Sequence, residues 1–95
     1  MRKLMLCLLV VLPSISLAEQ PSCEDVSDLA RDVMRNRQAN IPMAEMMKAT
    51  EGMPMVQSII KEAYKIPRYG SEEFKRDAMT DFSNNWYMAC LESGE

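Results

Sequence analysis

Histidine is absent from this sequence of 95 residues, and only three glycines are present. Without an imidazole, the chain has no histidine general base, no Ser/His or Cys/His pair and no ordinary zinc site. Three glycines are too few for the glycine-rich loops that cradle phosphate groups. Carboxylate pairs such as Glu72/Glu73 and Asp77/Asp81 are present, but the helical pattern described below places them on solvated faces. These absences predict that the protein is not an enzyme and holds no cofactor.

Basic residues are also in the minority. Lys and Arg number 11, against 14 Asp and Glu, and the net charge is −3. Removal of the leader described below takes Arg2 and Lys3 with it, which brings the net charge of the mature chain to −5. Nucleic acids and anionic membrane surfaces both attract basic faces. Neither is therefore expected as a partner.

The first 18 residues have the pattern of a cleavable signal peptide. Two basic residues precede the unbroken apolar run 4–12, and small residues follow at Ser16 and Ala18. A membrane-spanning helix needs about 20 apolar residues, whereas a shorter apolar core with these flanks is typical of a signal peptide. The sequence therefore predicts that residues 1–18 are removed and that residues 19–95 form a single domain. That domain is expected to be periplasmic or secreted, without a stable membrane anchor.

Two of the three cysteines remain after removal of the leader, because Cys7 lies within it. Cys23 and Cys90 then form an isolated pair in an exported domain, which is typical of a disulfide in an oxidising compartment. A metal site is the competing interpretation, but two thiolates would need further soft ligands and histidine is absent. A domain of this size rarely gathers a sufficient core on its own. We therefore predict a Cys23–Cys90 disulfide.

Apolar residues recur at three- and four-residue intervals, and no alternating strand pattern of useful length appears. Ser22, with Asp25 three residues later, predicts the N-cap of a first helix, and Ser71 predicts the cap of the last. Pro42 and Pro54 suit the first turns of two shorter helices. The expected fold is all-α: a compact small bundle of about four helices, two long and two short, closed by one disulfide. The expected helices cover residues 22–38, 42–51, 54–66 and 71–91.

The last expected helix carries a row of residues four positions apart: Phe74, Ala78, Phe82, Trp86 and Cys90. We expect this row to form the buried stripe of the helix, with Cys90 directed toward Cys23 across a shared core. The polar face of the first expected helix, by contrast, should be exposed to solvent. That face comprises Asp28, Arg31, Asp32 and Arg35.

Methionine is unusually frequent, with ten residues in the chain. Met43, Met46 and Met47 are spaced so that they share one face of the second expected helix. Three interpretations fit this spacing. The methionines pack into the core, or they form an adaptable surface for a partner protein, or their soft thioethers hold Cu(I).

The segment that follows the third expected helix contains two tyrosines and an arginine beside a proline. Tyr64, Arg68 and Tyr69 have the composition of an interaction hot spot. The alternative is a local role, in which Tyr64 packs inward and Arg68 stacks on Tyr69. Both interpretations fit the sequence.

Several short patterns support a resemblance that covers nearly all of the mature chain. They are Ser-Cys-Glu-Asp at 22–25, Arg-Gln at 37–38, Pro-Arg-Tyr at 67–69, Asp-Phe at 81–82 and Cys-Leu at 90–91. In these features the chain resembles a group of short exported proteins of proteobacteria and their phages or prophages. That group has no established activity. The resemblance implies an exported context and, by association, roles such as superinfection exclusion or control of lysis.

The Cys-Glu-Asp setting of Cys23 is also similar to that of HdeA-type periplasmic acid chaperones, which are small, all-helical and held by one disulfide. Those chains continue well past their second cysteine, whereas Cys90 lies five residues before the end of this sequence. Protonation of the 14 acidic residues below about pH 4 would give the chain a strongly positive charge and loosen the bundle. An acid-responsive chaperone is therefore one functional hypothesis.

The leading hypothesis is a small exported protein-binding module that acts as an inhibitor or accessory of another envelope protein. An acid-responsive periplasmic chaperone and a Cu(I) carrier are the two alternatives. The candidate contact residues of the binding module are Met43, Met46, Met47, Tyr64, Arg68 and Tyr69.

Overall fold

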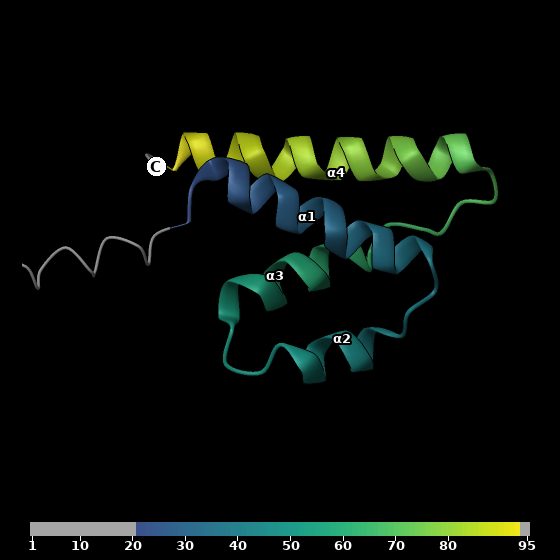
Figure 1. The fold of residues 1–95 in the computed structure, drawn as a ribbon, viewed down its shortest axis with the longest axis horizontal. Coiled ribbons are helices and arrows are strands. Elements are labelled where there is room, and N and C mark those ends of the chain that lie inside the picture. The colour runs from purple at the N-terminus through teal and green to yellow at the C-terminus, as the bar shows by residue number, and fades with distance from the viewer. Residues whose placement is uncertain (1–20, 94–95) are drawn as a thin grey trace, which may run out of the picture.

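The computed structural model describes residues 21–93, and within them all regular structure is helical (Figure 1). The helices are α1 (Cys23–Gln38), α2 (Met43–Ala49), α3 (Pro54–Ala63) and α4 (Glu72–Glu92). The predicted all-α fold with two long and two short helices is confirmed. The predicted signal peptide, residues 1–18, lies outside the described residues. Over residues 21–93, no helix has both the length and the apolar character needed to cross a membrane.

The two long helices begin where their capping residues predict. The Ser22 hydroxyl accepts a hydrogen bond from the Asp25 backbone N–H at 3.0 Å, and the Asp25 carboxylate accepts one from the Ser22 backbone N–H at 3.3 Å. At the start of α4, the Ser71 hydroxyl accepts a hydrogen bond from the Phe74 backbone N–H at 3.1 Å. These bonds satisfy N–H groups that have no partner inside the helix. Each cap therefore determines the first turn locally.

The two short helices end earlier than the sequence predicts. α2 stops at Ala49 because the chain turns at Gly52, whose φ of 84° is a left-handed conformation that glycine adopts without strain. α3 stops at Ala63 rather than continuing to residue 66. Pro67 accounts for this difference, since a proline disfavours helical geometry in the residue before it and supplies no backbone N–H.

Helix α1 lies between the other elements (Figure 1). α4 packs along one side of α1 in the antiparallel direction and makes the largest interface of the molecule. α3 packs on another side of α1, and α2 packs against α3. The Cys23–Cys90 disulfide joins the first turn of α1 to the last turns of α4, with 5.6 Å between the Cα atoms. This confirms the predicted pairing, and a disulfide is compatible with an exported protein.

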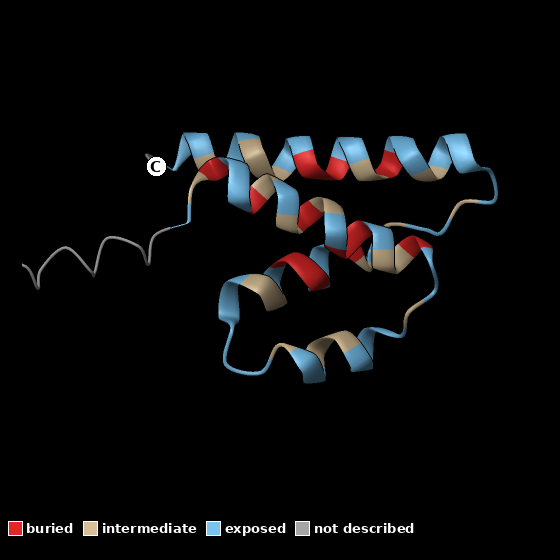
Figure 2. Ribbon diagram, viewed as in Figure 1, coloured by how far each residue is buried: buried red, intermediate tan, exposed pale blue. Residues whose placement is uncertain are grey.

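The hydrophobic core lies where α1, α3 and α4 meet (Figure 2). α2 contributes no fully buried residue, and its partly buried side chains pack against this core. The core therefore depends on three helices, and the fourth covers one edge of it. The buried core residues are Ala30, Val33, Met34, Ile59, Ile60, Ala63, Ala78 and Phe82.

The row predicted to form the buried stripe of α4 is only partly buried. Ala78 and Phe82 are buried, but the Phe74 side chain is 57% exposed, so its assignment to the core was wrong. The reason is helical geometry: each step of four residues turns the side chain by about 40°, and four such steps turn it by about 160°. The stripe therefore leaves the α1 interface at the start of α4. Ser83, one residue after Phe82, occupies the interface instead and is 1% exposed.

The polar face of α1 also differs from the prediction at one position. Asp28, Asp32 and Arg35 are exposed as expected, and Arg35 forms an ion pair with Asp32. Arg31 is half-buried, however, and its Nη2 atom donates a hydrogen bond to the Ser83 hydroxyl at 3.4 Å. A buried hydroxyl requires such a partner. Arg31 therefore belongs to the α1–α4 interface.

Candidate functional site

The end of α1 anchors the segment that joins α3 to α4. The Gln38 side chain is 3% exposed, and its amide donates a hydrogen bond to the Pro67 carbonyl at 2.9 Å and accepts one from the Tyr69 backbone N–H at 2.9 Å. The Arg37 guanidinium donates a hydrogen bond from Nε to the Ile66 carbonyl at 2.9 Å. These bonds satisfy backbone groups in a turn that lacks its own ladder of hydrogen bonds. The sequence analysis singled out neither residue for this role, although Gln38 follows a buried methionine by four positions.

Tyr64 packs inward, as one of the two interpretations of this segment expects. Its hydroxyl donates a hydrogen bond to the Ile41 carbonyl at 2.5 Å, and the Arg37 guanidinium carbon lies 5.0 Å from the centre of its ring. Burial raises the pKa of Tyr64 above its ordinary value, and the positive charge of Arg37 partly opposes that shift while Glu45 adds to it. Both ends of this side chain are therefore engaged within the protein.

Tyr64→Phe is expected to reduce the loss of stability at alkaline pH. Because the pKa of Tyr64 is raised in the folded state, the stabilisation from its protonated hydroxyl is fully present below the ordinary value of 10.0 and is lost as the pH rises through the raised pKa. At pH 7, the variant should be less stable by about 1 kcal/mol, because one hydrogen bond is missing. Urea unfolding between about pH 8 and 12 measures this difference. If the free energies of unfolding of the two proteins changed by the same amount over this pH range, the prediction would be contradicted.

Tyr69 and Arg68 do not stack on each other. The ring of Tyr69 meets the ring of Phe74 edge-on, with 6.2 Å between centroids and 72° between planes. Tyr69 is half-buried, whereas Arg68 is exposed. The expected Arg68–Tyr69 stack is therefore replaced by an aromatic pair that joins the turn to the first residues of α4.

The three methionines of α2 occupy two different environments. Met46 and Met47 are half-buried and pack against the core, and the Met46 sulfur accepts a hydrogen bond from the Asn36 side-chain amide at 3.5 Å. Met43 is 37% exposed. Of the three interpretations, core packing describes the positions of Met46 and Met47. Cu(I) binding and partner binding by these residues stay predictions.

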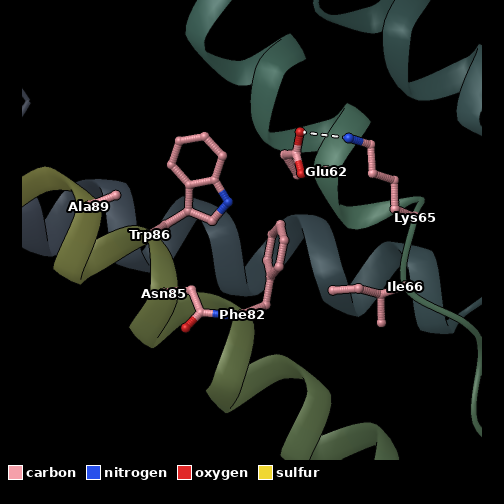
Figure 3. A pocket seen from close by; sticks show the side chains of 7 residues that line it. All are labelled: Glu62, Lys65, Ile66, Phe82, Asn85, Trp86 and Ala89. Carbon is pink, nitrogen blue, oxygen red and sulfur yellow. Dashed lines mark hydrogen bonds and ion pairs between the residues drawn. The ribbon is translucent and has the colours of Figure 1, made fainter.

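An open apolar groove runs between α3 and α4, and Figure 3 shows the half of it that Glu62 and Lys65 border. One half has a volume of about 370 Å³ and is lined by Glu62, Lys65, Ile66, Phe82, Asn85, Trp86 and Ala89. The other half has a volume of about 410 Å³ and is lined by Pro21, Val26, Met55, Trp86, Ala89, Cys90 and Ser93. Trp86 and Ala89 line both halves. We refer to these twelve residues as the Trp86 groove.

Most of the side chains that line the Trp86 groove are apolar. The rings of Phe82 and the half-buried Trp86 form a T-shaped pair, with 6.4 Å between centroids, and Met55 is 40% exposed at the opposite wall. Charge is confined to one end, where the Lys65 ammonium lies 3.1 Å from the Glu62 carboxylate (Figure 3). Large aromatic and methionine side chains that remain open to solvent are enriched in protein interfaces. The groove therefore suits an apolar segment of another protein.

Groups suited to catalysis do not converge on the groove. The carboxylate pairs Glu72/Glu73 and Asp77/Asp81 are exposed on α4 and lie outside it. Over the part of the chain that the structure describes, no three side chains of His, Cys, Asp or Glu are placed to hold a metal ion together.

The groove was not predicted from the sequence. Trp86 was expected in the buried stripe of α4 and is half-buried, since an indole is often too large to be fully buried. Met55, the second residue of α3, was not among the predicted contact residues, although it is more exposed than Met46 or Met47. The available signal was a tryptophan within the apolar stripe and a small residue, Ala89, three positions later on the same face.

Comparison with family models, curated proteins and solved structures gives no match for this chain. The resemblance to short exported proteins of proteobacteria and phages, and to HdeA-type chaperones, therefore stays an expectation.

Proposed function

We propose that this chain is an exported protein-binding module that acts in the periplasm or outside the cell, where it docks onto another envelope protein. The observation that supports the proposal is the Trp86 groove, an open apolar surface of two adjoining halves with an aromatic side chain at its centre. Trp and Met are among the residues that contribute most at protein interfaces. The Cys23–Cys90 disulfide supports an oxidising compartment.

The dimensions of the groove favour a helical segment as its occupant. The α4 residues that line it run from Phe82 to Cys90, which corresponds to about 12 Å along a helix axis. α3 forms the opposite wall from Met55 onward, and Val26 of α1 lies at one end. A groove of this length between two helices can hold about two turns of a partner helix, with the apolar face of that helix directed into the groove.

The proposed binding surface, the Trp86 groove, does not include the contact residues predicted from the sequence. Tyr64, Met46 and Met47 are engaged in contacts within the protein, whereas Met43 and Arg68 are exposed. Met43 and Arg68 therefore stay candidates for contacts with a partner at the edge of the surface. The acid-chaperone and Cu(I)-carrier hypotheses stay predictions.

Site-specific crosslinking in the envelope tests the proposal. A benzophenone side chain at Asn85, on the rim of the groove, is expected to give a discrete adduct, whereas one at the exposed Lys61 is not. Met55→Asp should then reduce the yield of the adduct about tenfold or more, because an ionised carboxylate must lose its hydration in an apolar contact. Met53→Asp is the matched control, since Met53 is 50% exposed and lies outside the groove.

The comparison of the two aspartate variants decides the outcome. Met53 precedes Pro54 as the N-cap of α3, a position that tolerates aspartate, so this variant should fold and crosslink like the wild type. An adduct of equal yield with Met55→Asp and Met53→Asp would show that the groove is not the contact surface. Circular dichroism is the control that tests whether both variants keep the same helical content.

A further inference from the structure

A second hollow lies on α4, nearer its first turns than the Trp86 groove. It has a volume of about 250 Å³ and is lined by Tyr69, Phe74, Asp77, Ala78 and Asp81. We refer to it as the Phe74 hollow. Its lining combines two aromatic rings, two carboxylates and the small side chain of Ala78. This composition differs from that of the Trp86 groove, which carries its charges only at one end.

Core packing does not explain the position of Phe74. The side chain is 57% exposed, and its ring packs against that of Tyr69 in a T-shaped pair, with 6.2 Å between centroids. Tyr69 is itself fixed, because its backbone N–H donates to the buried Gln38 side chain at 2.9 Å. An exposed phenylalanine that is held by a fixed neighbour leaves a ring surface available to a ligand.

The two carboxylates of the hollow are also available. Asp77 and Asp81 are four residues apart, so they lie on successive turns of one face of α4. Both are exposed, and within residues 21–93 the ion pairs are Arg35–Asp32 and Lys65–Glu62, which leave these two out. A pair of like charges on neighbouring turns is unfavourable by itself. A cation between them would remove that repulsion.

We propose that the Phe74 hollow binds an arginine side chain of a partner protein. A guanidinium group is planar, stacks on an aromatic face and donates hydrogen bonds to carboxylates in a fork, and the hollow presents a ring and two carboxylates together. The sequence has a net charge of −3, and loss of the predicted leader with its two cations would make it −5, which also favours a basic partner. The occupant is a basic segment, distinct in chemistry from the apolar segment proposed for the Trp86 groove.

The hollow and the Trp86 groove both lie along α4, and Asp81 of the hollow directly precedes Phe82 of the groove in the sequence. Asp77 and Asn85 are eight residues apart, which is about 12 Å along the helix. A single partner segment with an apolar residue and an arginine at that separation would reach both surfaces. The binding of arginine to the hollow does not depend on this arrangement, and it is tested without the partner.

Titration of the disulfide-bonded protein with Nα-acetyl-argininamide, followed by NMR, tests the proposal. We expect saturable shifts of the Phe74 and Tyr69 ring signals with an affinity on the order of 10 mM, since exposed cation–π and ion-pair contacts are individually weak. Nα-acetyl-lysinamide should bind several-fold more weakly, because an ammonium group lacks the planar fork. Nα-acetyl-norleucinamide, which is uncharged, should give no saturable shift at these rings.

Variants of the hollow provide the decisive comparison. Asp77→Asn combined with Asp81→Asn should weaken argininamide binding about tenfold or more, whereas Glu51→Gln combined with Glu92→Gln, with the same change in net charge, should leave it unchanged. Phe74→Leu should weaken binding two- to fivefold through loss of the ring, on the order of one cation–π contact. Absence of saturable shifts in the wild type, or equal weakening by both double variants, would overturn the proposal.

Discussion

Loss of the Cys23–Cys90 disulfide is expected to lower the free energy of unfolding by about 4 kcal/mol. The two cysteines are 67 positions apart, so the bond closes a loop that contains nearly all of the described chain. In the unfolded state such a loop removes much conformational freedom, and the loss of the constraint favours unfolding. Small domains are stable by only about 5–15 kcal/mol, so this change is a large fraction of the total.

Thermal unfolding followed by circular dichroism measures this effect. The reduced protein should unfold at least about 15 °C below the oxidised protein, since about 1 kcal/mol shifts the midpoint of a domain of this size by 4–8 °C. The Cys23→Ser/Cys90→Ser variant should behave like the reduced protein. Reductant added to that variant should have no effect, which separates the role of the bond from that of the reagent. A shift of less than about 5 °C on reduction would contradict the prediction.

Phe82→Ala is expected to destabilise the protein by about 3–5 kcal/mol. The Phe82 side chain is 4% exposed within the core of α1, α3 and α4, and its ring supports Trp86 at 6.4 Å. Truncation removes buried apolar area and leaves a cavity that the neighbouring helices fill only in part. The same change at Phe74, eight residues earlier in α4, should cost less than about 1 kcal/mol, because that side chain is 57% exposed.

Urea unfolding measures both variants under identical conditions. The chain contains one tryptophan, so the fluorescence of Trp86 reports directly on the environment beside Phe82. Phe82→Leu is a volume-conserving control and should lose less than about 1.5 kcal/mol. Similar losses for Phe82→Ala and Phe74→Ala would mean that the whole row of α4 is buried, and would contradict the burial described above.

Some features of the fold followed directly from neighbouring residues. Ser22 with Asp25 and Ser71 predicted the starts of the long helices, and each forms the hydrogen bond that its position implies. Pro54 predicted the start of α3. The pairing of Cys23 with Cys90 followed from their number, because only these two cysteines lie outside the predicted leader. These predictions succeeded because caps, proline geometry and covalent pairing depend on few residues.

The candidate binding surfaces did not follow from the same reasoning. Spacing alone placed Phe74 and Phe82 on one stripe, yet one is exposed and the other is buried. The difference arises because Phe74 and Phe82 are two steps of four residues apart, which turns their side chains about 80° away from each other, so that only Phe82 faces the core. The spacing within one helix carries no information about where a neighbouring helix crosses it.

The sequence by itself determined that this chain is helical, where its long helices begin and which two cysteines join them. Only the tertiary structure decided that Trp86 stands in an open groove, that Phe74 faces solvent beside two carboxylates, and that Gln38 anchors the turn before α4. The physical reason is the range of the interactions. Helix starts depend on groups within one turn, whereas burial depends on contacts such as Arg31 with Ser83, which lie 52 residues apart.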